Sequence, residues 1–223
     1  MSPTLLFAFG FFGLTLWLGF AHRQAGHKRR DARAGYFAEA AKLFDSVKTK
    51  VQPTGFARMT GHKNGHAFDL QVVQDSLTFR KLPALWVMVT LPETLPVKAT
   101  LNFMVRPSGN EPFSHFASLP QSLECPSFLP EGIAIRTDNA ANIRANYLAK
   151  YAKLFDDQHI KELVISPQGI RLVILAEEAD RGRYLIFRDS EMGAEPISAN
   201  HITPLLQSIL ALRNDILAME QSQ

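Results

Sequence analysis

Apolar residues dominate the first 21 positions of the chain, where no residue carries a charge. Residues 5–20 read LLFAFGFFGLTLWLGF and are almost wholly apolar. About 20 such residues in a helix cross the hydrocarbon core of a bilayer. Trp17 lies near one end of this run, where an indole favours the membrane interface. The pattern predicts a transmembrane anchor over residues 1–21.

A basic segment, residues 22–34, follows the apolar run and contains Arg23, Lys28, Arg29, Arg30 and Arg33. A cleaved signal peptide would carry its positive charge before the apolar run, so it fits less well. A buried core helix is a second alternative, and the adjacent cations argue against it. Positive flanks stay in the cytoplasm. We therefore expect a single-pass inner-membrane protein with its N-terminus out and its domain cytoplasmic.

The charge distribution bears on the partners of the chain. The formal net charge is +3. Residues 22–33 hold five basic residues and Asp31, which gives +4, so the rest of the chain carries −1. Cations gathered beside a bilayer are explained by anionic lipid headgroups. We expect a lipid bilayer with such headgroups as a partner, and no nucleic acid.

Residues 35–223 show the alternation of a soluble α+β domain. A helical pattern covers residues 32–50 and ends at Pro53-Thr54-Gly55. Strand patterns follow, with an Asn64-Gly65 hairpin signal between the first two. The expected strands are residues 56–60, 67–73, 77–81, 84–91, 97–105, 132–136, 160–165, 170–175 and 184–188.

Proline residues interrupt residues 107–131 repeatedly and predict a long irregular connection between two possible lobes, 35–106 and 132–223. Amphipathic helices are expected at residues 145–155 and 198–219, which makes three in the domain with residues 32–50. Residues 36–45 (YFAEAAKLFD) and 147–156 (YLAKYAKLFD) match at seven of ten positions. Each precedes an expected hairpin, so two related helix–hairpin lobes or a chance likeness of amphipathic helices both fit.

Few residues form a pattern with recognisable chemistry. Cys125 is the single cysteine, so no intramolecular disulfide can form, and nothing near it indicates a nucleophile. His62 and His66 have a metal-ligand spacing but flank a turn, and His115, His159 and His201 could converge with them only through the fold. Glu177, Glu178 and Asp180 lie beside Arg181 and Arg183, as in a mixed-charge hairpin tip. We therefore expect no catalytic residues, no metal and no cofactor.

The remaining candidate site is the polar stretch Arg136-Thr137-Asp138-Asn139, which follows an expected strand. Arg136, Asp138 and Asn139 could bind a ligand where the strand ends. The stretch equally suits the start of a helix, with Asp138 or Asn139 as its N-cap.

These observations predict a membrane-tethered, non-enzymatic interaction, scaffold or accessory protein. Its protein partner would lie in the membrane or at its cytoplasmic face, and the contact surfaces would be residues 106–132 and the exposed side of residues 198–219. The alternative is a membrane-anchored enzyme or small-ligand sensor with a site near Arg136–Asn139.

Overall fold

The computed structural model describes the backbone of residues 3–76, 82–143, 151–187 and 190–221, and side chains from residue 11 to residue 219 within these ranges. Its helices are α1 (Pro3–Ala34), α2 (Ala38–Ala41), α4 (Arg181–Phe187) and α5 (Ala199–Gln221), with short 3₁₀ turns η1 (Phe116–Ser118), η2 (Ala140–Asn142) and η3 (Ala152–Asp156). Its strands are β1 (Ser46–Val51), β2 (Ala57–Lys63), β3 (His66–Asp75), β4 (Ala84–Leu91), β5 (Leu101–Val105), β6 (Gln121–Leu123), β7 (Ile133–Thr137), β8 (Ile160–Ser166) and β9 (Gly169–Glu178).

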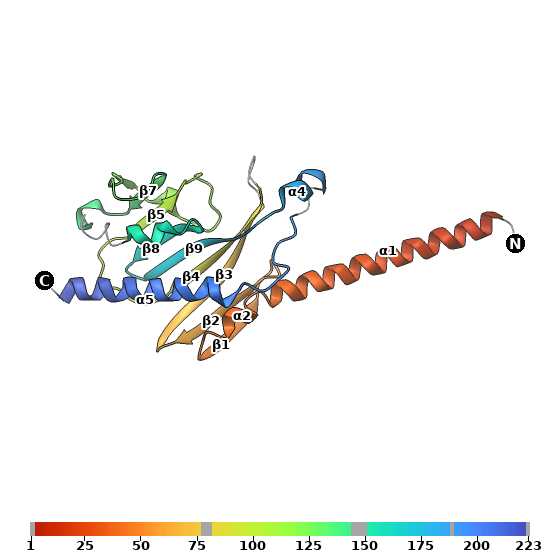
Figure 1. Cartoon of the computed structure of the whole chain (residues 1–223), viewed down its shortest axis with the longest axis horizontal. Coiled ribbons are helices and arrows are strands. Elements are labelled where there is room, and N and C mark those ends of the chain that lie inside the picture. The colour runs from red at the N-terminus through yellow and green to blue at the C-terminus, as the bar shows by residue number, and fades with distance from the viewer. Residues whose placement is uncertain (1–2, 77–81, 144–150, 188–189, 222–223) are drawn as a thin grey trace.

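The nine strands form one antiparallel sheet in the order β1-β2-β3-β4-β9-β8-β5-β7-β6 (Figure 1). The first four strands are consecutive in the chain. The hairpin of β8 and β9 is inserted between β4 and β5, so β5 pairs with both β8 and β7. Segments 35–106 and 132–223, which the sequence suggested as two lobes, therefore contribute strands to the same sheet.

Turn residues fix the register of two hairpins, β2–β3 and β8–β9. Asn64 and Gly65 both have positive φ, 52° and 79°, as the two-residue turn between β2 and β3 requires. Gly169 opens β9 with φ 141°, and a Cβ there would lie 2.0 Å from the carbonyl oxygen of Leu91. Only glycine allows the β8–β9 turn to approach the end of β4 so closely.

The main hydrophobic core lies between the sheet and α5, which runs along one face in Figure 1. Alternate strand residues point into this core, among them Leu70, Val87 and Leu172. The buried side of α5 consists of Ile202, Leu205, Leu206, Ile209, Leu212 and Ile216. These positions recur every three or four residues and confirm the amphipathic helix expected from the sequence.

The face of the sheet opposite α5, called the outer face below, also carries apolar residues that are covered by the Pro-rich connection. There Phe113 and Phe116 pack with Met104 and Val173 in a second, smaller cluster. Trp86 contributes to it and lies 5.1 Å from the ring of Phe113. The Pro-rich connection therefore wraps part of the outer face.

The predicted transmembrane anchor is wrong. Within the part of the chain that the structure describes, no helix has both the length and the apolar character needed to cross a membrane. The predicted inner-membrane location, single-pass topology and N-terminus-out orientation depended on this anchor and are withdrawn with it.

Four further expectations need correction or lie wholly or partly outside the described residues. The helix expected at 32–50 is broken: α1 ends at Ala34, α2 has one turn, and residues 46–51 form β1 because they pair with β2. Residues 184–187, expected as strand, belong to α4. The strand expected at 77–81 is outside the described residues, and of the helix expected at 145–155 only the part from residue 151 is described, as η3.

Candidate functional site

A single row of residues crosses the outer face from one edge of the sheet to the other. Residues paired directly across antiparallel strands point to the same side. The register therefore aligns Lys48, Thr60, Asp69, Thr90, Arg171, Val164, Asn102, Arg136 and Ser122. Eight of these nine residues are polar, an unusual concentration for strands that are otherwise rich in apolar residues.

The middle of this row lines a groove with a volume of about 360 Å³. Its floor is formed by Thr90, Arg171, Val164 and Asn102, and His115, the residue before η1, contributes to one wall. Thr100, Leu119 and the β8–β9 turn complete the lining. The groove thus combines hydroxyl, amide, imidazole and guanidinium groups from segments far apart in the sequence.

A fully buried carboxylate, that of Glu162 on β8, organises the polar groups beside the groove. Asn102 donates from Nδ2 to Glu162 Oε1 at 2.9 Å, and Arg171 donates from Nη2 to Oε2 at 3.3 Å. The hydroxyl of Ser114 also donates to Oε1. A buried charge is tolerated when it is paired and hydrogen-bonded in this way.

Two polar atoms of this cluster have no hydrogen-bond partner among the described residues: Asn102 Oδ1 and Arg171 Nε. Asn102 is only 2% exposed. Unsatisfied buried acceptors and donors are rare in folded proteins and call for a specific explanation, such as a bound water or ligand. Asn102 Oδ1 is an acceptor and Arg171 Nε is a donor, and both residues line the groove.

The Pro-rich connection is held against the sheet by charged side chains. Lys161 donates from Nζ to the carbonyl of Val105 at 2.6 Å and lies 3.7 Å from the carboxylate of Glu111. Burial by itself would raise the pKa of Glu111, but hydrogen bonds from Ser108 and the charge of Lys161 outweigh it, so the pKa is lowered. These contacts hold the start of the Pro-rich connection against β8, and His115 and Leu119 further along the connection line the groove.

The three candidate ligand residues expected from the sequence lie beside the groove, and each has a structural partner. Arg136 donates to the carbonyl of Ala117 at 2.8 Å and lies over the ring of Phe116, 5.8 Å from its centroid. Asp138 accepts from the backbone N–H of Thr100 at 2.9 Å. Asn139 caps η2 by accepting from the N–H of Ala141, which confirms the capping alternative.

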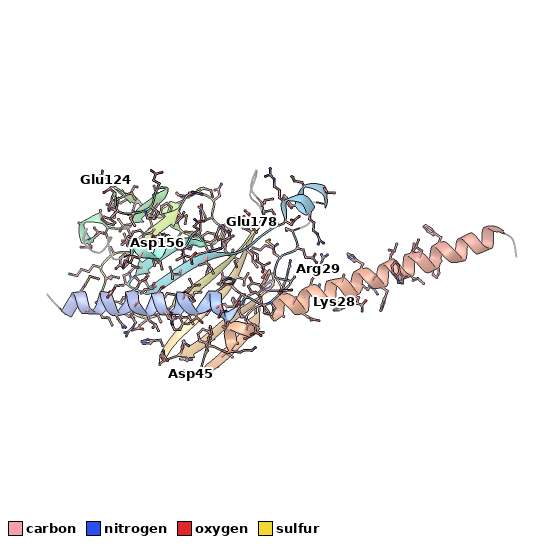
Figure 2. All side chains as sticks on the ribbon, viewed as in Figure 1. Lys28, Arg29, Asp45, Glu124, Asp156 and Glu178 are labelled. Atoms are coloured by element: carbon pink, nitrogen blue, oxygen red, sulfur yellow. The ribbon has the colours of Figure 1, made fainter. Side chains whose placement is uncertain are left out.

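Two of the five basic residues assigned to a membrane surface contact the domain itself. Arg29 forms an ion pair with Glu191 at 3.3 Å, and Arg33 lies 5.0 Å above the ring of Phe56. Lys28 lines a pocket between α1 and residues 190–194. Figure 2 shows Lys28 and Arg29 at the end of α1 that meets the domain. Arg23 and Arg30 are exposed on α1. At least part of the basic segment thus holds α1 to the domain.

The acidic and histidine residues singled out in the sequence are dispersed. Within the described ranges, no three His, Cys, Asp or Glu residues are arranged to hold a metal ion. Glu177 accepts from the backbone N–H of Gly193 and interacts with Tyr36, whose pKa is raised mainly by burial. Asp180 accepts from the backbone of Arg183 in the first turn of α4. These carboxylates serve the fold and do not converge on the groove.

The sequence did not identify Asn102, Glu162 or Arg171 as site residues. Asn102 and Arg171 each interrupt an apolar stretch of their strand, and Glu162 lies beside Lys161 before the apolar residues 163–165. These interruptions are the signal that could have indicated them. These three residues are close in space because the β8–β9 hairpin is inserted between β4 and β5. No local sequence pattern predicts this insertion. No protein-family model matches this chain, and no curated protein matches it in sequence.

Proposed function

We propose that this chain is a non-enzymatic interaction or accessory protein that attaches to a partner through α1. The observation that supports this is the exposure of the apolar part of the helix. Seven large apolar side chains between residues 11 and 20 are 51–71% exposed: Phe11, Phe12, Leu14, Leu16, Trp17, Leu18 and Phe20. Figure 1 shows α1 extending away from the sheet, so the domain leaves these side chains uncovered.

The distribution of these side chains around the helix indicates the kind of partner. Each residue turns an α-helix by about 100°, so the seven side chains point in all directions. A helix that is apolar on every side is stable in water only when it is surrounded. A single groove or a second copy of α1 would cover one side. The proposed partner is therefore a protein whose apolar helices enclose α1.

Photo-crosslinking of the full chain in its native cells tests this proposal. A photoreactive phenylalanine analogue replaces Phe11, Leu16 or Trp17, which face different directions on α1. All three positions should crosslink to the same protein. The matched control carries the analogue at Gln207, an exposed position of α5, and should not label that protein. Labelling of lipid alone, or labelling from one side of the helix only, contradicts the proposal.

A second candidate function is the binding of a small polar ligand in the groove. The orphaned acceptor of Asn102 and donor of Arg171 favour it, because a ligand or an ordered water there would satisfy both. The charge of Arg171 is balanced by Glu162, so the groove suits a neutral molecule better than an anion. In this candidate function, the ligand binds in the groove and not at the adjacent turn Arg136–Asn139, where the sequence suggested a site.

Thermal-shift screening of the full chain against neutral amides, polyols and nucleosides tests the second candidate. A ligand that binds the groove raises the melting temperature of the wild type. Thr100→Val removes a hydroxyl from the groove and should reduce the shift. Gln71→Ala, on the outer face but away from the groove, should leave it unchanged. The candidate fails if no compound shifts the wild type, or if both variants respond as the wild type does.

A further inference from the structure

The free edge of β1 is the longest strand edge that the described sheet leaves unpaired. β1 is at one end of the strand order and β6, which has three residues, is at the other. All six residues of β1 are exposed, and its only strand partner among the described residues is β2. An unpaired strand edge presents backbone N–H and C=O groups to any extended segment of suitable chemistry.

The two sides of β1 differ in character. Ser46, Lys48 and Lys50 point to the outer face, whereas Val47, Thr49 and Val51 point to the other side. Val47 and Val51 are 42% and 53% exposed, although neighbouring residues of β2 on that side are buried in the core. A strand added at this edge would cover the two valines and lie beside the two lysines.

The charge around the lysines determines which strand fits. Lys48 pairs with Thr60 and Lys50 pairs with Arg58 across β2. Arg58 is itself bound to Asp69 at 2.8 Å, so Asp69 is already engaged. Lys48 and Lys50 therefore face an incoming strand with their charges uncompensated by β2. Opposite charges placed directly across two strands are stabilising, whereas like charges are destabilising.

The same lysines disfavour a second copy of the chain. In a two-fold antiparallel pairing of β1 with itself, the same face of both strands lies on one side. Lys48 and Lys50 of the two copies would then be opposite or diagonal to one another, and the repulsion would weaken the pair. Edge lysines are a common device against such self-association.

We propose that β1 binds an extended, acidic segment of a partner protein by strand addition. In this segment, Asp or Glu side chains alternate with apolar side chains. The carboxylates lie beside Lys48 and Lys50, and the apolar side chains cover Val47 and Val51. The backbone of the segment pairs with the free edge of β1. This contact is separate from the proposed α1 contact, because the N-terminal part of α1 extends away from the sheet (Figure 1).

Fluorescence anisotropy with the full chain tests the proposal. The probe is a fluorescein-labelled peptide of about eight residues, a typical strand length, in which glutamate and valine alternate. We expect saturable binding, and about ten-fold weaker binding when lysine replaces glutamate in the peptide. A third peptide, N-methylated at alternate residues of the glutamate–valine sequence, cannot pair through its backbone along one edge and should bind at least as weakly.

Charge reversal of β1 provides the decisive comparison. In the double variant K48E/K50E, the preference should invert, so that the lysine–valine peptide binds better than the glutamate–valine peptide. Both lysines are exposed, so the variant should keep the fold, and circular dichroism checks this. Lys98→Glu, an exposed lysine outside β1, is the matched control and should keep the wild-type preference.

Three results overturn the proposal. The first is equal binding of the glutamate and lysine peptides, or no binding of either. The second is an unchanged preference in K48E/K50E, or full binding by the N-methylated peptide. The third is self-association of the full chain, seen in sedimentation velocity, that the glutamate–valine peptide competes away, because the edge would then belong to a second copy.

Discussion

Arg213 on α5 donates from Nε to Glu93 Oε1 at 2.7 Å, joining residues 120 positions apart in the chain. Glu93 follows β4, and its second oxygen, Oε2, lies 3.1 Å from Nδ1 of His66 at the start of β3. One carboxylate thus connects α5 to the end of the sheet. Both Glu93 and Arg213 are partly shielded from water, with side chains 29% and 19% exposed. This shielding distinguishes the pair from ordinary surface ion pairs.

Replacing Glu93 by Gln should lower the free energy of unfolding by about 1–2 kcal/mol, because a charge-assisted hydrogen bond is lost in a partly shielded place. Urea denaturation measures the change. Lys42→Met is the control: it removes the Lys42–Glu39 pair, whose side chains are 68% and 47% exposed, and should change stability by well under about 1 kcal/mol. Equal effects of the two substitutions would contradict the importance of the Glu93 contact.

The Glu93 contact should also depend on pH. The hydrogen bond from Arg213 is the largest cause of a lowered pKa for Glu93, and burial acts in the opposite direction. A carboxyl group whose pKa is lower in the folded state contributes stability above its unfolded pKa, and this contribution is lost as the pH falls through the folded pKa. The stability difference between wild type and Glu93→Gln should therefore be full at neutral pH and shrink in acid. A difference that grows as the pH falls would be inconsistent with this sign.

Glu162 and Arg171 should behave as a coupled pair. Glu162→Gln leaves Arg171 without its charge partner inside the sheet and should cost about 2–4 kcal/mol. Arg171→Met leaves a buried carboxylate uncompensated and should cost a similar amount. In the double variant, the loss should be smaller than the sum of the two single losses by about 1 kcal/mol or more. Strict additivity in this double-mutant cycle would show that the pair does not act as a unit.

Gly169 should tolerate no side chain. Its φ of 141° and the 2.0 Å approach of a Cβ to the carbonyl oxygen of Leu91 mean that Gly169→Ala requires a backbone shift. We expect a loss of about 3 kcal/mol or more, measured by thermal or urea unfolding. Gly65→Asn is the matched control: Gly65 also has a positive φ, but a Cβ there meets nothing within 4 Å. Asn accepts this conformation, so the control should lose less than about 1 kcal/mol.

Local patterns predicted the elements that are determined by residues only a few positions apart. The Asn64-Gly65 turn, β4 and α5 were expected from their residues, because turn chemistry, apolar runs and helical spacing act over a few residues. The same reasoning failed for residues 46–51. Their helical composition was overridden by pairing with β2, a contact that propensity does not include. It failed for α1 as well, because no helix in the described part of the chain is long and apolar enough to cross a membrane.

The sequence by itself determined the α+β class, the amphipathic face of α5 and most of the strands of the sheet, since these follow from the period of apolar residues. Only the tertiary structure decided which strands are neighbours. By inserting β8 and β9 between β4 and β5, it brought Asn102, Glu162 and Arg171 together beneath one groove. It also engaged Asp138 and Asn139 with backbone groups and left β1 as a free edge. Contacts between residues of different strands depend on the order of the strands in the sheet. The alternation of apolar and polar residues within one strand does not determine that order.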